Sequence, residues 1–132
     1  MLNGMVNSKP RTCGFRFSIT DGLAIIIATI LTVIALPEIG SLAWVILFVL
    51  GHFFLFCNVF RIPPKPELIW AGTFLLNMTT FTFLPLNIFE NFIFQLPITF
   101  FLIIKEVFKP TYHGIYSLKI NKEIDKYLAG EI

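Results

Sequence analysis

Residues 41–60, SLAWVILFVLGHFFLFCNVF, are apolar almost throughout, and residues 61–67, RIPPKPE, begin with a cation and contain three prolines. In a helix that rises about 1.5 Å per residue, some 20 apolar residues match the roughly 30 Å hydrocarbon layer of a bilayer. An arginine at the end of such a run is typical of the membrane surface. Proline disfavours continuation of a helix. This stretch therefore predicts a transmembrane helix followed by a stiff connection.

The whole chain has the composition of a membrane protein. Of its 132 residues, 56% are hydrophobic and 14% are charged, and phenylalanine occurs 16 times. A soluble domain of this length cannot bury so much apolar surface. The apolar residues form continuous blocks, whereas the strands of a membrane β-barrel alternate. We therefore expect an all-α integral membrane protein.

Three further blocks pass the same length test. The four predicted transmembrane helices cover residues 18–36, 41–60, 68–86 and 92–108. Ser18 or Thr20 can cap the first helix, and Asp21 suits its positive end. Pro37 and Gly40 predict a tight turn after it. The chain then consists of a basic leader (1–17), a transmembrane domain (18–109) and a tail (110–132).

Basic residues are confined to one side of this arrangement. All 10 lysines and arginines precede the first span, lie between the second and third, or end and follow the fourth, whereas the opposite loops carry only Glu38 and Glu90. Lys and Arg in short loops remain on the cytoplasmic side. We predict four transmembrane helices in an antiparallel bundle with both termini cytoplasmic. The membrane is the cytoplasmic (inner) membrane or an equivalent energy-transducing organelle membrane.

Two features near the predicted surfaces refine this picture. Trp44 falls near the outer end of the second span and Trp70 near the inner end of the third, where tryptophans commonly lie at the membrane interface. Residues 121–130, NKEIDKYLAG, predict a short amphipathic helix capped by Asn121 and ended by Gly130. Either the inner leaflet, a partner or the protein's own bundle would cover its apolar face.

Six polar side chains inside the predicted spans are candidate site residues. They are Thr29, His52, Asn77, Thr80, Gln95 and Thr99. Four of them lie near the middle of their spans and are predicted to form one polar layer at the bilayer midplane. Those four are Thr29, His52, Asn77 and Thr99. Such a layer can hold helices together by hydrogen bonds, or it can form a small polar site or conduit.

His52 is the candidate with the widest chemistry. Its imidazole can hydrogen-bond Asn77 or a threonine, carry protons or substrate, or ligate the metal of a tetrapyrrole. Haem bound by two histidines would need a second intramembrane histidine, and His113 lies in the tail; one histidine suffices for a chlorophyll-type pigment. We favour the structural hydrogen bond, predict no cofactor and no other metal site, and keep a tetrapyrrole as an alternative.

The remaining sequence gives little indication of catalysis. No carboxylate lies deep inside a span, and there is no phosphate-binding glycine loop or HExxH motif. The net charge of +2 gives no reason to expect nucleic acid. Five basic side chains at the cytoplasmic face are candidates for binding lipid head groups: Arg11, Arg16, Arg61, Lys105 and Lys109.

These features lead to a prediction of function. We expect a non-enzymatic structural or accessory subunit of a membrane complex or homo-oligomer. Its partners would be membrane lipid and other membrane subunits or copies of itself. The alternative is a small carrier or flippase-like transporter with a midplane polar site at His52 and Asn77.

Overall fold

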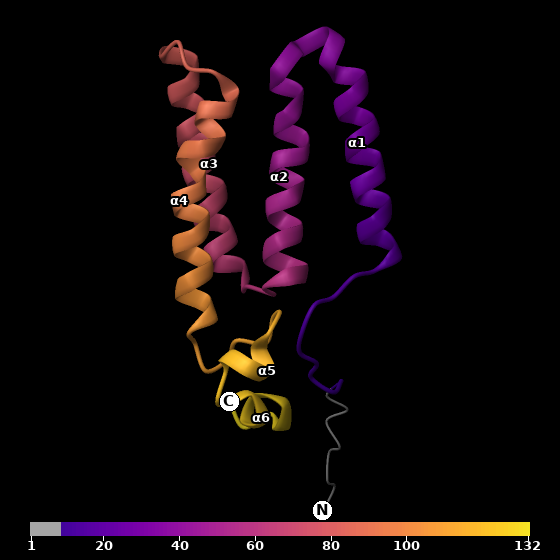
Figure 1. The fold of residues 1–132 in the computed structure, drawn as a ribbon, viewed down its shortest axis with the longest axis vertical. Helices are drawn as coiled ribbons and strands as arrows, with labels where there is room; N and C mark the ends of the chain where they lie inside the picture. The colour runs from indigo at the N-terminus through magenta and orange to yellow at the C-terminus, as the bar shows by residue number, and fades with distance from the viewer. Residues whose placement is uncertain (1–8) are drawn as a thin grey trace, which may run out of the picture.

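The computed structural model describes residues 9–132, which contain helices and no strands. Four long helices alternate in direction along the molecule (Figure 1). They are α1 (Ile19–Ile39), α2 (Trp44–Phe54), α3 (Pro64–Phe83) and α4 (Ile88–Val107). Two short helices, α5 (Ser117–Ile120) and α6 (Ile124–Ala129), lie beyond one end of them. Among the described residues, two stretches are long and apolar enough to cross a membrane, Ile19–Val59 and Ile88–Val107.

The start of α1 matches the sequence prediction, but its end does not. Ser18 caps the helix: its backbone N–H donates to the Asp21 carboxylate at 2.8 Å, and its hydroxyl accepts from the Asp21 N–H at 3.3 Å. The helix continues through Pro37 to Ile39, because proline removes one helical hydrogen bond without excluding the last turn. Gly40, with φ of 59°, then starts the turn into α2.

The second predicted span contains three kinds of helix. A 3₁₀ turn (Gly40–Ala43) precedes α2, and a π-helical turn (Leu55–Val59) follows it. In the π turn, the Phe60 N–H donates to the Leu55 carbonyl at 2.9 Å. Two of its carbonyls accept bonds from distant segments: Asn58 from the Arg16 N–H and Val59 from the Ile115 N–H. The wide turn thus joins α2 to both ends of the chain.

Helices α3 and α4 begin four residues before their predicted starts. Pro64 and Pro66 lie in the first turn of α3, where proline is tolerated because no helical donor is required. The predicted stiff connection is therefore only residues 61–63. Asn87 caps α4 together with Glu90, and the Asn87 N–H donates to the Glu90 carboxylate at 3.0 Å.

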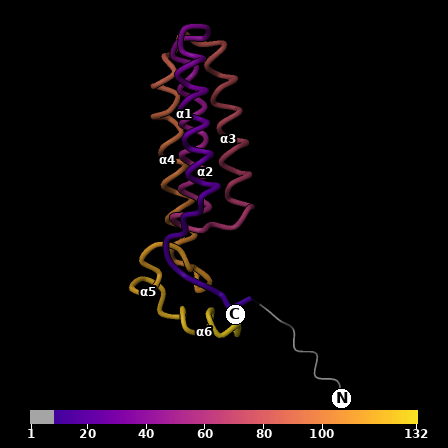
Figure 2. Tube along the Cα trace, turned by 90° about the vertical axis from the view of Figure 1, so that its right-hand side faces the viewer, coloured from indigo at the N-terminus to yellow at the C-terminus, as the bar shows by residue number. Residues whose placement is uncertain are grey.

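The long helices form two hairpins, α1 with α2 and α3 with α4 (Figures 1 and 2). Aromatic rings fill the space between the hairpins: Phe48 stacks on Phe92 at 4.0 Å between centroids, and His52 stacks on Trp70 at 4.6 Å. Helix α1 lies on the far side of α2 from α3 and α4. It packs mainly against α2. The helices therefore do not close into a bundle in which each has two neighbours.

The two tryptophans have different environments. Trp44 is 39% exposed, whereas Trp70 is only 1% exposed and belongs to the hydrophobic core with Phe56 and Phe74. Trp70 therefore does not present its ring to a membrane surface as an interfacial tryptophan would, because the ring packs between the two hairpins. Aromatic stacking on Phe74, with centroids 5.2 Å apart, further fixes the ring.

Three segments far apart in sequence meet at one end of the long helices, which we call the junction. They are the leader from residue 9, the connection between α2 and α3, and the tail after α4. The Gly14 N–H donates to the His113 carbonyl at 2.9 Å, and the Ile115 N–H donates to the Val59 carbonyl at 2.8 Å. Gly114 approaches the chain so closely that a Cβ there would lie 2.3 Å from the Phe60 carbonyl oxygen.

The predicted tail helix is shorter than expected. Helix α6 ends at Gly130, whose φ of 80° is the left-handed conformation expected of a helix stop, but it begins only at Ile124. The Asn121 side chain donates to the carbonyls of Pro110 and Tyr112, both at 2.7 Å. The Oδ1 of Asn121 accepts from the Glu123 N–H at 2.9 Å. Asn121 therefore connects the start of the tail to the residues just before α6.

Candidate functional site

The interior polar side chains run along the contact between α3 and α4, which we call the polar seam. On α4, Asn91, Gln95 and Thr99 follow one another at four-residue spacing and are 0, 0 and 3% exposed. Four-residue steps place the first and last about 12 Å apart along the helix. The polar groups thus extend along the helices, and the prediction of a single midplane layer is wrong.

Hydrogen bonds connect the two sides of the polar seam. Gln95 Nε2 donates to the Trp70 carbonyl at 3.2 Å and to Thr73 Oγ1 at 3.1 Å. Trp70 Nε1 donates to Thr99 Oγ1 at 2.9 Å. Nearer the connection between α3 and α4, Asn77 Nδ2 donates to the Asn91 carbonyl at 2.8 Å. Three of the predicted site residues, Asn77, Gln95 and Thr99, therefore belong to one seam.

His52 lies beside this seam but does not bond Asn77 or a threonine as predicted. Its Nδ1 is 2.8 Å from the Phe48 carbonyl, one turn earlier on the same helix. Because a carbonyl oxygen only accepts, this contact requires the proton on Nδ1. The imidazole contacts the other hairpin through its stack on Trp70. The Phe48 ring also lies against it, with centroids 4.3 Å apart.

The two other predicted site residues are threonines whose hydroxyls bond their own helices. Thr29 is exposed on α1 and donates to the Ile25 carbonyl at 2.8 Å, so it takes no part in the polar seam. Thr80 is exposed on α3 and donates to the Leu76 carbonyl at 2.9 Å. Bonds of this kind satisfy a hydroxyl without requiring a second helix.

Two fully buried amides in the polar seam keep polar atoms without partners in the protein. The unpaired atoms are Nδ2 and Oδ1 of Asn91 and Oε1 of Gln95. An unpaired buried donor or acceptor costs about 1–3 kcal/mol. The sequence prediction missed Asn91 because it placed the start of the fourth span at residue 92. The four-residue spacing from Asn91 through Gln95 to Thr99 was the signal that could have identified it.

A cavity of about 380 Å³ opens beside the polar seam, between α3 and α4. Three of the predicted site residues line it: Asn77, Thr80 and Gln95. The rest of its wall is apolar and consists of Leu84, Leu86, Phe94 and Ile98. The cavity thus combines amide and hydroxyl groups with hydrocarbon, and its lining carries no charged side chain.

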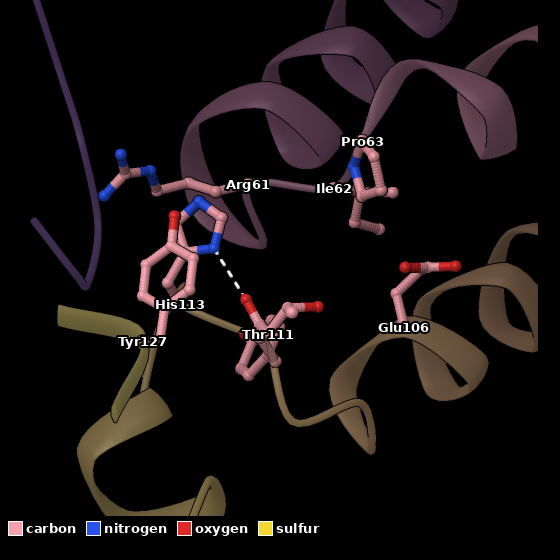
Figure 3. Close-up of a pocket in the computed structure, with 8 residues that line it drawn as sticks. Arg61, Ile62, Pro63, Glu106, Thr111, His113 and Tyr127 are labelled. Atoms are coloured by element: carbon pink, nitrogen blue, oxygen red, sulfur yellow. Dashed lines mark hydrogen bonds between the residues drawn. The ribbon is translucent and has the colours of Figure 1, made fainter. Parts of the chain in front are cut away.

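A second cavity, of about 360 Å³, lies at the junction (Figure 3). Its wall includes Arg61, Glu106 and His113, together with Tyr127 of α6. The His113 ring stacks on Tyr127 at 4.5 Å, and the Arg11 guanidinium lies 4.9 Å from the centre of the same tyrosine ring. The junction is therefore built from aromatic and cationic groups of the leader, the α2–α3 connection and the tail.

The His113 environment opposes protonation. Burial lowers the pKa of His113, the charges of Arg61 and Arg11 lower it further, and the hydrogen bond of Nδ1 to the Thr111 carbonyl at 2.9 Å acts in the opposite direction. Figure 3 shows this bond and the ring lying between Arg61 and Tyr127. Burial also raises the pKa of the neighbouring Tyr112 to about 12, so its hydroxyl remains a donor to the Ile115 carbonyl.

Three of the five predicted lipid head-group ligands form bonds within the protein. Arg11 Nη1 donates to the carbonyls of Tyr127 and Ile132, and Arg61 Nη1 donates to the Thr12 carbonyl at 2.8 Å. Lys109 Nζ forms an ion pair with Glu106 at 2.5 Å. The bonds of Arg11 and Arg61 connect distant segments of the junction, whereas the Lys109 pair lies at the end of α4. Arg16 and Lys105 stay predictions for lipid contact.

Within residues 9–132, no group of three or more His, Cys, Asp or Glu side chains is placed to hold a metal ion. Neither a protein-family model, nor a curated protein, nor a solved structure matches this chain.

Proposed function

We propose that this chain is a non-catalytic subunit that crosses a membrane four times, with both ends on the cytoplasmic side. The stretch Ile19–Val59 folds back at its 3₁₀ turn and so supplies two antiparallel crossings. Helix α4 supplies another by its length and composition. These observations support an even number of crossings if α3 is also a span.

Helix α3 is the least apolar of the four, and the argument for it is one of packing. It has 20 residues, like α4, and would be about 30 Å long. It runs beside α4 and is bonded to it along the polar seam. If α4 crosses the bilayer, α3 must do so too. Its polar groups Thr73 and Asn77 are paired with α4, as groups inside a bilayer need to be.

The observation that carries the subunit proposal is the isolation of α1. Helices α2, α3 and α4 share one aromatic interface, but α1 packs mainly against α2. Its outer face presents large apolar side chains, with Ile26 57% and Val33 61% exposed. A membrane helix with one neighbour has a face available for another subunit or a second copy. Small membrane proteins associate through such faces by close packing.

The interior polar groups form hydrogen bonds and ring stacks between helices, which favours a structural role over a conduit for substrate. Trp70, Thr73 and Thr99 are bonded to one another or to Gln95, and His52 is stacked between aromatic rings. Tetrapyrrole ligation is the weaker alternative for His52, because the imidazole is already packed against the rings of Phe48 and Trp70. An absorption band in natively purified protein that disappears in His52→Ala would favour the tetrapyrrole instead.

The test is the assembly state of the full chain, extracted into polymer nanodiscs without detergent and measured by native mass spectrometry. We expect the 15.1 kDa chain in complexes with itself or with another membrane protein. The double variant Ile26→Ala, Val33→Ala should shift most of the material to the single chain. The matched control Leu75→Ala, Leu76→Ala alters an equally exposed face of α3 and should leave the complexes intact. A wild-type chain that is alone in its nanodisc would refute the proposal.

A further inference from the structure

One of the side chains that line the cavity between α3 and α4 has a buried acceptor whose orientation is fixed. Gln95 lines the cavity and is 0% exposed. The amide cannot be turned over, because the Trp70 carbonyl only accepts and therefore requires the donor Nε2 on its side. Oε1 is therefore the amide atom left without a partner in the protein. A molecule in this cavity that donates a hydrogen bond to Oε1 would remove the cost of burying an unpaired acceptor.

The charge of the lining narrows the class of molecule. None of the side chains around the cavity is charged, so a phosphate or ammonium group would be desolvated there without a counter-ion. Phe94, Ile98 and Leu84 provide an apolar wall that suits hydrocarbon. The cavity volume of about 380 Å³ falls in the range of small-molecule sites. These properties indicate an uncharged amphiphile with one hydrogen-bond donor.

The depth of Gln95 points to the same class. It lies seven residues from the start of α4, or about 10 Å along the helix from the end opposite the junction. In the proposed four-span arrangement, on which this site rests, that depth is below the charged head groups of phospholipids. A neutral lipid has no charged group to hold at the surface, so its hydroxyl can reach this level.

We propose that the cavity between α3 and α4 binds a neutral lipid through one free hydroxyl group, which donates to Oε1 of Gln95. Phe94 and Ile98 contact its hydrocarbon. The contacts lie within one chain, so the site does not depend on the assembly proposed for α1.

The experiment uses the full chain in phosphatidylcholine nanodiscs and a diacylglycerol carrying a photoactivatable diazirine in one acyl chain. After irradiation, we expect the label on peptides of α3 and α4 around the cavity. Unlabelled diacylglycerol should compete at a concentration about tenfold lower than its 3-O-methyl ether does. The ether has the same hydrocarbon but cannot donate a hydrogen bond. Equal competition by the two lipids would overturn the proposal.

Two neighbouring threonines provide matched variants. Thr79 and Thr80 are both exposed on α3 and both donate to the carbonyl four residues earlier, but only Thr80 lines the cavity. Thr80→Trp should fill the cavity and reduce labelling at least tenfold, whereas Thr79→Trp should label like the wild type. Unchanged labelling in Thr80→Trp would overturn the proposal. If Thr80→Trp does not fold, the competition between diacylglycerol and its methyl ether on the wild-type chain decides whether the proposal stands.

Discussion

Trp70 links three of the long helices through one side chain. Its ring stacks on His52 of α2 and Phe74 of α3, and its Nε1 donates to Thr99 of α4. A ring that is only 1% exposed makes these contacts without access to solvent or lipid. At the residue scale, the association of the two hairpins therefore depends strongly on this position.

Replacing each tryptophan by phenylalanine tests whether the buried position of Trp70 matters more to stability than the exposed position of Trp44. We expect Trp70→Phe to lower the free energy of unfolding by about 1–3 kcal/mol, because it removes one hydrogen bond and leaves unfilled volume. Trp44→Phe, at a 39% exposed position, should change it by less than about 0.5 kcal/mol. Unfolding by sodium dodecyl sulfate in mixed micelles measures both. Equal effects of the two substitutions would contradict the role given to Trp70.

His113 should make the stability of the junction depend on pH. Burial and the charges of Arg61 and Arg11 place its pKa below the ordinary value of about 6.5. Arg61, Glu106, Tyr112 and Tyr127 are the other ionisable groups that line its cavity. Within the pH range between the two pKa values, the unfolded chain binds more protons than the folded chain, so stability rises with pH. The contribution is complete above about pH 6.5 and is lost as pH falls from there through the folded pKa.

The measurement is the melting temperature of the wild type and of His113→Phe between pH 8 and pH 5. Phenylalanine can keep the stack on Tyr127 but cannot titrate. We expect the wild type to lose more stability than the variant as the pH falls. Parallel curves for the two proteins would show that His113 does not control the acid sensitivity.

At the scale of elements, the junction depends on a glycine and on the π turn. The Ile115 N–H donates to the carbonyl of Val59, the last residue of the π turn, and Gly114 lies against Phe60. Gly114→Ala would place Cβ 2.3 Å from the Phe60 carbonyl oxygen, which forces the tail away from the connection. We expect trypsin to cleave the tail at Lys119 and Lys122 at least tenfold faster in this variant.

Gly51→Ala is the matched control for this substitution. A Cβ at Gly51, within α2, would meet nothing within 4 Å. Alanine is also a better helix former than glycine by about 0.5–1 kcal/mol. Cleavage of the tail should therefore remain at the wild-type rate. Slow cleavage in Gly114→Ala would mean that the tail does not need this close contact.

The sequence patterns located the helices better than they located the helix ends. Ser18 with Asp21 was readable as a cap because both residues act locally. The start of α4 was misplaced because the capping pair Asn87 and Glu90 precedes the apolar block used to define the span. The π turn of α2 was not predictable in this way, because its carbonyls are satisfied by segments far away in sequence.

At the scale of the whole molecule, helical spacing predicted which side chains share a face, but it could not predict which faces meet. Gln95 and Thr99 are four residues apart in the sequence, and both are buried on one face of α4. Thr29 was assigned to the same layer from its depth alone, yet α1 lies beyond α2 and Thr29 faces outward. Depth in a span does not determine rotation about the helix axis, and rotation follows from packing against neighbours.

The distribution of charge is the whole-molecule property on which the membrane proposal rests. The basic residues lie in the leader, the α2–α3 connection, the tail and the turns of α3 and α4 next to them, and these segments meet at the junction. At the other end, Glu38 lies in the last turn of α1 and Glu90 in the first turn of α4. Cationic segments of this kind remain on the cytoplasmic side. Four crossings are the arrangement that places all three basic segments there.

Site-directed labelling in sealed vesicles of known orientation tests this arrangement most directly. Single cysteines are needed at the leader (Cys13, with Cys57→Ala), at the tail (Lys119→Cys) and at the opposite connections (Glu38→Cys and Glu90→Cys), the last three with Cys13→Ser and Cys57→Ala. A membrane-impermeant maleimide should label Cys13 and position 119 from the cytoplasmic face, and positions 38 and 90 from the other face. Labelling of Cys13 and position 119 from opposite faces would contradict the four-crossing account.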